Sequence, residues 1–151
     1  MSETLSKRRL KLWIRLLRVT RAAEAELREF LRTQHGSTLP RFDVLAALHR
    51  AHTPLTMSEL SRQLLVSNGN TTTVVDRLEL DGLVTRTPAA DRRIIHVALT
   101  DDGRAHFEQL AVDHEAQVNQ LFGGLSGADL AALEGLLHRM TATRTTEKAP
   151  R

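Results

Sequence analysis

Two groups of side chains in the middle of this chain could do chemistry on another molecule. The first is an unbroken polar run, SNGNTTT, which covers residues 67–73. Asparagine amides can donate and accept hydrogen bonds in the pattern that adenine presents, and threonine methyl groups can meet the methyl group of thymine. The second group is the pair Arg92 and Arg93, because guanidinium groups suit a narrow minor groove. Both groups indicate a nucleic-acid partner.

The polar run has the composition of a helix start that fits closely against another surface. Its residues have poor intrinsic helix propensity, and Ser67 is of a type that favours the N-cap. Val74, Val75 and Leu78 follow, and we expect them to anchor the helix to a core. Gly82 is expected to end it. The sequence thus predicts a short helix that begins after Ser67 and exposes polar side chains in its first turns.

The arginine pair lies between two segments with the composition of strands, residues 84–87 and 94–99. The intervening segment, PAADRR, is long enough for the tip of a β-hairpin. Upstream, TMSE at residues 56–59 has the signature of a capping box and starts another short helix. Two short helices followed by an arginine-tipped hairpin predict a winged helix-turn-helix. Its second helix would enter the major groove of duplex DNA, and its hairpin would reach the backbone or the minor groove.

Apolar periodicity predicts a long helix before this lobe. Residues 5–34 place apolar side chains at three- and four-residue steps, which for about 30 residues gives a helix about 45 Å long. The small core of this chain cannot cover such a length, so we expect a helix from a second copy to cover the excess. Gly36 is expected to end this helix, and Pro40 to open the next one in its first turn.

Two further helices are predicted after the hairpin. Thr100 is expected to cap the first, which runs to about Leu121, and Ser126 starts the second, which carries an apolar side. Residues 143–151 have the composition of a frayed polar tail. Residues 52–55 are expected to be an irregular break before the capping box.

Charge and composition limit the classes of function. In residues 1–50, 11 Lys and Arg against 5 Asp and Glu give +6; in 51–104, 6 against 7 give −1; in 105–151, 4 against 6 give −2. The predicted DNA-binding lobe is not basic overall, so its cations must be concentrated on one face. The absence of cysteine excludes disulfides and cysteine-ligated zinc. A charged N-terminus and no apolar run of membrane-spanning length favour a cytoplasmic protein.

No residue spacing typical of an enzyme or a metal site is found. His49 and His52 are three apart but flank the end of a helix, and His106 and His114 are eight apart. The chain has no nucleophile with a base at the required spacing and no glycine-rich phosphate loop. We therefore expect neither an enzyme nor a metal nor a cofactor.

Three segments together resemble a known family. The chain carries LPRFDVLAAL, VDRLELDGLV and DRRIIHVALTDDGR in this order, and the combination resembles the multiple-antibiotic-resistance regulator (MarR) family over nearly the whole chain. The resemblance implies a single domain of mainly α (α+β) class, in which a winged helix-turn-helix lobe at residues 40–104 sits on a helical dimerisation scaffold. The scaffold would be formed by residues 5–35 and 105–143, with residues 144–151 as the polar tail.

The resemblance also implies a function. Proteins of this family are homodimeric transcription factors, and many are repressors that small anionic or phenolic ligands release from DNA. We therefore expect a homodimeric transcriptional repressor with a pseudo-palindromic double-stranded operator and a small-molecule effector as its partners. The alternative is a winged-helix protein that organises DNA architecturally and has no effector. No membrane partner is expected.

The predicted DNA contacts combine the polar helix with the hairpin. They are Ser67, Asn68, Asn70, Thr71, Thr73, Arg77, Arg86, Arg92 and Arg93. For Ser67, a capping role alone would explain the residue type. For Arg77, the alternative is an ion pair with Asp81 or with Glu59.

The hairpin arginines also have an alternative, namely a solvated turn in which Asp91 pairs with one of them. The family pattern suggests that Asp91 braces Arg93 while an arginine of the tip contacts DNA. Arg41 and Arg62 are weaker candidates for contacts with the DNA backbone.

A ligand site follows from the resemblance only. In this family the site lies between the dimer helices and the winged lobe, and a urate-responsive branch uses a tryptophan, an aspartate and two arginines. Trp13 and Asp43 match two of these residue types, whereas no arginine pair can be assigned. The alternative is a tryptophan in the core and a solvated aspartate.

Overall fold

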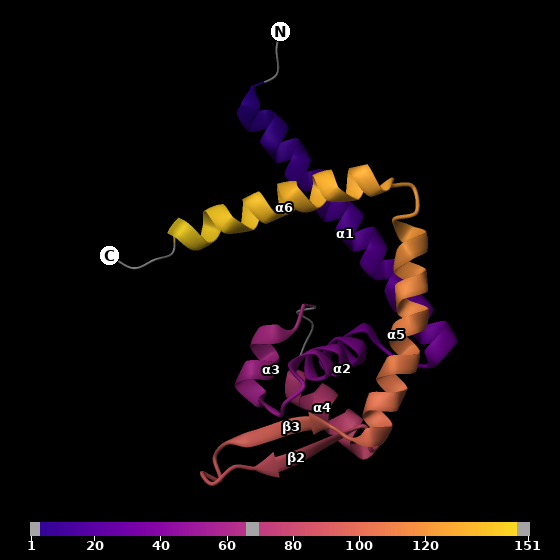
Figure 1. The fold of residues 1–151 in the computed structure, drawn as a ribbon, viewed down its shortest axis with the longest axis vertical. Coiled ribbons are helices and arrows are strands. Elements are labelled where there is room, and N and C mark those ends of the chain that lie inside the picture. Colours follow the sequence, from indigo (N-terminus) through magenta and orange to yellow (C-terminus); the bar gives the residue numbers. More distant parts are fainter. Residues whose placement is uncertain (1–3, 66–69, 148–151) are drawn as a thin grey trace. The chain divides into compact units, whose positions relative to one another are not determined.

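A computed structural model describes residues 4–65 and 70–147, with side chains described up to residue 142. The elements are α1 (Leu5–His35), α2 (Leu39–Ala51), β1 (Leu55–Thr56), α3 (Met57–Gln63), α4 (Thr71–Leu80), β2 (Val84–Pro88), β3 (Ile95–Leu99), α5 (Asp101–Leu121) and α6 (Gly127–Glu147) (Figure 1). This mainly helical fold with a small sheet confirms the predicted fold class. The chain divides into two compact units, Met1–Gln117 and Val118–Arg151, which we describe separately.

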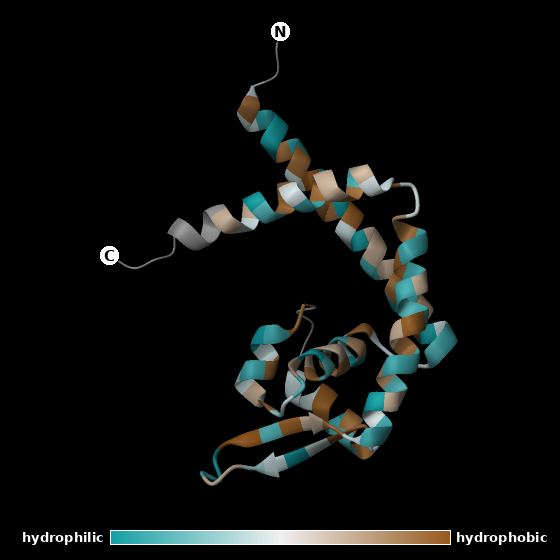
Figure 2. Ribbon diagram, viewed as in Figure 1, coloured by the Kyte–Doolittle hydropathy of each residue, from teal (hydrophilic) through white to brown (hydrophobic). Residues whose placement is uncertain are grey.

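The long helix α1 is confirmed, with ends that local capping explains. The hydroxyl of Thr4 accepts a hydrogen bond from the Lys7 N–H, and Gly36 adopts a left-handed conformation with φ of 57° that ends the helix. Near this end, Leu31 is fully buried and clusters with Leu39 and Leu110. The rest of α1 alternates polar and apolar residues along its length (Figure 2). Its apolar side chains Leu5, Leu10, Leu12, Trp13, Ile14 and Val19 are 38–58% exposed.

The main core lies between α2, α3, α4 and the sheet. Its fully or almost fully buried side chains are Val44, Leu45, Ala47, Leu48, Leu60, Val75, Leu78, Val84 and Val97. The sheet is antiparallel with the strand order β1-β3-β2. Leu55 pairs with Val97, so the predicted break at residues 52–55 is wrong at its last residue. Such a two-residue strand exists only because β3 provides its hydrogen-bond partner.

The predicted capping box at the start of α3 is confirmed. The hydroxyl of Thr56 accepts from the Glu59 N–H at 3.2 Å, and the Glu59 carboxylate accepts from the Thr56 N–H at 2.8 Å and from its hydroxyl at 2.9 Å. These hydrogen bonds from Thr56 lower the pKa of the Glu59 carboxyl. Reciprocal capping fixes the first residues of α3, and hence the direction in which it leads to α4.

A close backbone contact joins the start of α5 to the segment after α4. The Thr100 hydroxyl donates to the Gly82 carbonyl at 2.7 Å and accepts from the Gly103 N–H at 2.9 Å. The Thr100 N–H donates to the Leu83 carbonyl at 3.1 Å. Gly103 is buried against that same carbonyl, and a Cβ atom on Gly103 would overlap the oxygen. Only glycine fits here, because Thr100 holds the Leu83 carbonyl in place.

We predict that Gly103→Ala destabilises the protein, although alanine normally stabilises a helix relative to glycine. The overlap with Leu83 forces a backbone shift, which costs about 1–3 kcal/mol of the free energy of unfolding. Urea denaturation of the purified variant measures this loss. The control is Gly135→Ala in α6, where, apart from the helix's own backbone, no described residue lies within 4 Å of the added Cβ. That variant is expected to gain about 1 kcal/mol, and an equal gain for Gly103→Ala would contradict the packing argument.

The second unit contains α6, which begins with another reciprocal cap. The Asp129 carboxylate accepts from the Ser126 N–H at 2.9 Å and from its hydroxyl at 2.6 Å, and these bonds lower the pKa of the Asp129 carboxyl. The predicted start at Ser126 is thus confirmed as the cap. The end differs, because α6 continues to Glu147 whereas we predicted a frayed tail from residue 143. Polar composition alone therefore misplaced the end of this helix.

The apolar side of α6 is not covered within the second unit. Leu130, Leu133, Leu136, Leu137 and Met140 are 38–49% exposed. Among the described residues, no helix is both long and apolar enough to cross a membrane. Exposed apolar side chains of this kind, on α6 as on α1, are typical of surfaces that contact another surface.

Candidate nucleic-acid interface

The second helix of the predicted winged helix-turn-helix is α4, which we call the reading helix, and Asn70 caps it. The Asn70 side-chain oxygen accepts from the Thr72 N–H at 3.0 Å, and the helix begins at Thr71. The prediction that this helix begins after a Ser67 cap is therefore wrong in position. Both residues are good caps by type, and the low helix propensity of the intervening residues favours the later start. Ser67 and Asn68 lie outside the described residues.

The helix α4 has one face in the core and the opposite face in solvent. Val75 and Leu78 are fully buried, whereas Thr73 and Arg77 are exposed and Thr71 is half-buried. The capping bond engages the oxygen of Asn70, and over the described residues no partner of its side-chain N–H groups is found. A helix start of this kind presents hydrogen-bonding groups to another molecule, while the buried side chains on the opposite face keep their packing.

Neither alternative proposed for Arg77 holds. Asp81 pairs with Arg41 of α2 at 2.5 Å, and Glu59 is engaged by Thr56. Over the described residues, no ion pair of Arg77 is found. The pairing also means that Arg41, proposed as a backbone contact, ties α2 to the end of α4. Arg62 lies exposed on α3.

The hairpin presents Arg92 and Arg93 at its tip. The Ala89 N–H donates to the Ile94 carbonyl, and the Ile94 N–H donates to the Asp91 carbonyl, both at 2.9 Å. The Asp91 carboxylate accepts from the backbone N–H of Arg93 at 3.1 Å. Asp91 therefore braces Arg93 as predicted, but through the backbone rather than through the guanidinium. Both arginines are exposed, and the tip lies at the free end of the β2–β3 hairpin (Figure 1).

Arg86 of β2 is arranged differently from the tip arginines. Its guanidinium lies 2.6 Å from a carboxylate oxygen of Asp76 and 3.4 Å from one of Glu79, both on α4. It also donates to the Thr72 carbonyl at 3.4 Å. Its side chain is 23% exposed. The sequence suggested a DNA contact here, but these intramolecular partners were not visible in the local pattern.

The two residues suggested for a ligand site have separate environments. Trp13 is 58% exposed on α1, and Asp43 is 5% exposed in α2. The Asp43 carboxylate accepts from the Leu65 N–H at 2.7 Å. The alternative assignment, a core tryptophan and a solvated aspartate, is wrong for both residues within the chain. Asp43 instead secures the backbone that follows α3.

We predict that Asp43→Ala costs about 1–3 kcal/mol of the free energy of unfolding, because the Leu65 N–H loses an acceptor that is itself buried. Asp43→Asn keeps an acceptor oxygen and should lose less. Urea denaturation compares both with Glu26→Ala, an exposed acid of α1 whose removal is expected to change stability by less than about 0.5 kcal/mol. Equal stabilities for Asp43→Ala and Glu26→Ala would show that the hydrogen bond does not contribute to the free energy of unfolding.

The histidines do not form a metal centre in the described part of the chain. The imidazole of His114 stacks on Phe42 with ring centroids 4.1 Å apart, and burial lowers the pKa of His114. Two others each lie near one carboxylate, His35 at 3.4 Å from Asp113 and His49 at 3.3 Å from Glu108. Over residues 4–65 and 70–147, no group of three or more His, Asp or Glu side chains could hold a metal ion.

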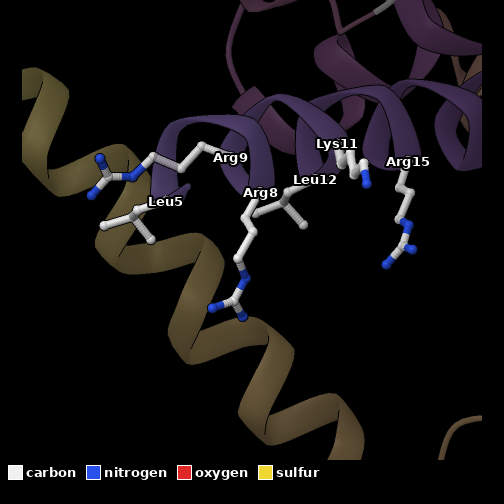
Figure 3. Close-up of a pocket in the computed structure, with 6 residues that line it drawn as sticks. All are labelled: Leu5, Arg8, Arg9, Lys11, Leu12 and Arg15. Carbon is white, nitrogen blue, oxygen red and sulfur yellow. The ribbon is translucent and has the colours of Figure 1, made fainter. Parts of the chain in front are cut away.

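A basic surface lies far along α1 from the core. Leu5, Arg8, Arg9, Lys11, Leu12 and Arg15 of this helix line an open depression on its surface (Figure 3). Between residues 7 and 21 the sequence has seven Lys and Arg and no Asp or Glu. The main positive charge of the chain is thus on α1 and not beside the reading helix α4.

Comparisons with known proteins match this arrangement. Residues 35–94 match the sequence profile of the MarR family. An uncharacterized HTH-type transcriptional regulator of Bacillus cereus is 31% identical over 111 residues, which cover 74% of this chain and 73% of that protein. YkoM of Bacillus subtilis is 32% identical over 94 residues, or 62% of this chain. PecS of Dickeya dadantii is 31% identical over 102 residues, or 66% of this chain. The chain spans only about three fifths of YkoM (60%) and of PecS (61%).

Solved structures are similar over almost the whole chain. A MarR family transcriptional regulator from Silicibacter pomeroyi has a TM-score of 0.80 and 27% identity, covering 94% of this chain and 99% of that one. A mutant MarR from E. coli complexed with operator DNA has a TM-score of 0.73 and 29% identity, covering 91% and 99%. BpsR of Bordetella bronchiseptica, whose DNA binding is regulated by 6-hydroxynicotinic acid, has a TM-score of 0.75 and 27% identity, covering 87% and 98%.

Proposed function

Because this chain belongs to the MarR family of winged-helix transcriptional regulators, we propose that it is a repressor that binds a double-stranded operator as a homodimer. Members of this family are DNA-binding regulators and not enzymes. The chain is therefore a DNA-binding regulator by class. Beyond this class, we propose that it represses transcription, that it acts as a homodimer and that a small ligand controls it.

The observation that carries the proposal is the pairing of two exposed groups on one rigid lobe. Thr73 and Arg77 face solvent from α4 while Val75 and Leu78 fix that helix in the core. Arg92 and Arg93 face solvent at the tip of the adjoining hairpin. A helix for the major groove and a cationic tip for the backbone or minor groove match the two features that duplex DNA offers.

A homodimer would place two such lobes on one operator. Recognition helices in successive major grooves must be about 34 Å apart. The apolar side chains named above for α1 and α6 are each 38% or more exposed, and a second copy would remove them from water. We propose that these helices are the dimerisation scaffold.

We also propose that a small anionic or phenolic ligand releases the protein from DNA. The similarity to BpsR, whose DNA binding 6-hydroxynicotinic acid regulates, supports this class of effector. Trp13 is available to such a ligand from α1, whereas Asp43 is already engaged by Leu65. A ligand bound beside the scaffold would change the spacing of the two lobes, so that both half-sites could not be engaged together.

One experiment separates a sequence-specific regulator from an architectural protein. Bound sequences are selected from random duplex DNA, and the selected duplex and a random duplex of equal length are titrated at one fixed salt concentration. A regulator should prefer the selected duplex by about a thousandfold or more, and the selected site should have two-fold symmetry. Comparable affinity for both duplexes would favour the architectural alternative and overturn the proposal.

A further inference from the structure

Arg86 connects the hairpin to the reading helix α4 through its side chain. Its partners on α4 are the Thr72 carbonyl at 3.4 Å, the Asp76 carboxylate at 2.6 Å and the Glu79 carboxylate at 3.4 Å. These three residues are spaced four and three apart, so they lie along one face of the helix. One guanidinium therefore spans about two turns of α4 from the neighbouring strand.

Because of the position of Arg86 in the hairpin, its contacts with α4 affect where the tip lies. Arg86 is opposite Val97 in the antiparallel register, two residues before the last pair, Pro88 with Ile95. The base of the hairpin is held by the buried Val84 and by the Thr100 hydrogen bonds to residues 82 and 83. Arg86 is closer to the tip than these, and its contacts set the distance from α4 at which Arg92 and Arg93 are presented.

The charges on α4 give the same contacts a second effect. Asp76 and Glu79 are 52% and 42% exposed, and their carboxylates would repel the phosphates of DNA beside a helix in the major groove. A guanidinium within hydrogen-bonding distance of one carboxylate and near the other offsets this repulsion. This local neutralisation is important because residues 51–104 have a net charge of −1.

We propose that Arg86 is a positioning residue that fastens the hairpin to α4 and neutralises two of its carboxylates, and that it does not itself contact DNA. This inference rests on the proposed DNA-binding function and replaces the direct contact that the sequence suggested for Arg86. A guanidinium that leaves Asp76 for a phosphate would restore an uncompensated carboxylate at the interface.

The test compares Arg86→Met in two backgrounds, the natural chain and a neutral one with Asp76→Asn and Glu79→Gln. Affinity for the selected operator is measured over a series of salt concentrations. In the natural background, Arg86→Met should weaken binding about tenfold without changing the slope of log K against log salt. In the neutral background, the same substitution should have an effect of less than about threefold, because its charged partners are already gone.

Arg50→Met at the end of α2 is the charge-matched control, and it should bind like the natural chain. Circular dichroism and urea denaturation verify that each variant is folded. A tenfold loss that persists in the neutral background, with a slope reduced by about 0.9, would identify a phosphate contact and overturn the proposal. A natural chain that does not prefer the selected operator would instead overturn the proposed function. In that case, non-additive unfolding free energies for Arg86→Met and Asp76→Asn would still verify the ion pair, but not its role in DNA binding.

Discussion

Replacing Arg92 and Arg93 together with alanine is expected to weaken operator binding about tenfold or more while the protein remains folded and dimeric. The tip is shaped by backbone hydrogen bonds and by the Asp91 carboxylate, which accepts from the Arg93 N–H. Removing the two side chains therefore leaves the turn intact. What is lost is positive charge at a site where the DNA backbone or a narrow minor groove concentrates negative potential.

Fluorescence anisotropy with the selected operator, at several salt concentrations, measures this loss. Each lost phosphate contact should reduce the slope of log K against log salt by about 0.9. Arg92→Lys with Arg93→Lys keeps both charges and separates charge from the geometry of guanidinium. Natural affinity in the double alanine variant would refute the assignment of the tip to DNA.

The elements that could be predicted from sequence are those specified by local patterns. The three- and four-residue apolar period of α1 extends over 31 residues, and the Thr56 and Ser126 caps each carry an acidic residue three positions later. Such signals need no knowledge of the tertiary fold. The two-residue strand β1 has no local signal at all, because it is defined by the pairing of Leu55 with Val97, 42 residues later.

In the candidate site, the local pattern did not reveal intramolecular partners that are distant in sequence. Arg41 pairs with Asp81, and Asp43 accepts from Leu65, 22 residues away. Arg86 looked like one more surface cation until α4 was placed beside it. Residue type predicted which side chains can bind a phosphate, but only the fold shows which of them are already engaged within the chain.

The start of α4 was predicted at the wrong residue. Ser67 and Asn70 are both favourable N-caps, and the low helix propensity of the residues between them, which favours the later start, was given too little weight. The later start at Thr71 engages the Asn70 oxygen in the cap. This limits Asn70 to donating through its amide N–H groups unless the same oxygen accepts a second hydrogen bond.

The largest effect is expected from substitutions that remove the dimer. Leu133 and Leu137 are 38% and 44% exposed on the apolar side of α6, and a second copy would bury them. Leu133→Glu with Leu137→Glu places four charges in the symmetric interface and removes four leucines from it. Only about two fifths of each leucine is left for the partner to bury, so each contributes about 0.6–1.2 kcal/mol to the interface. The dimer dissociation constant should therefore rise by about a hundredfold or more.

Analytical ultracentrifugation over a range of protein concentrations measures this change, and the monomeric variant should also lose the operator, because one lobe engages only one half-site. Ala131→Glu is the matched control, since residue 131 lies two positions before Leu133 and so points about 160° away from the apolar side of α6. It should remain dimeric and bind normally. A natural chain that sediments as a monomer would refute the proposed homodimer. A double glutamate variant that remains a dimer would show that α6 is not the interface, and the exposed apolar side of α1, with Trp13 at 58% exposure, would then be the surface to test by the same substitutions.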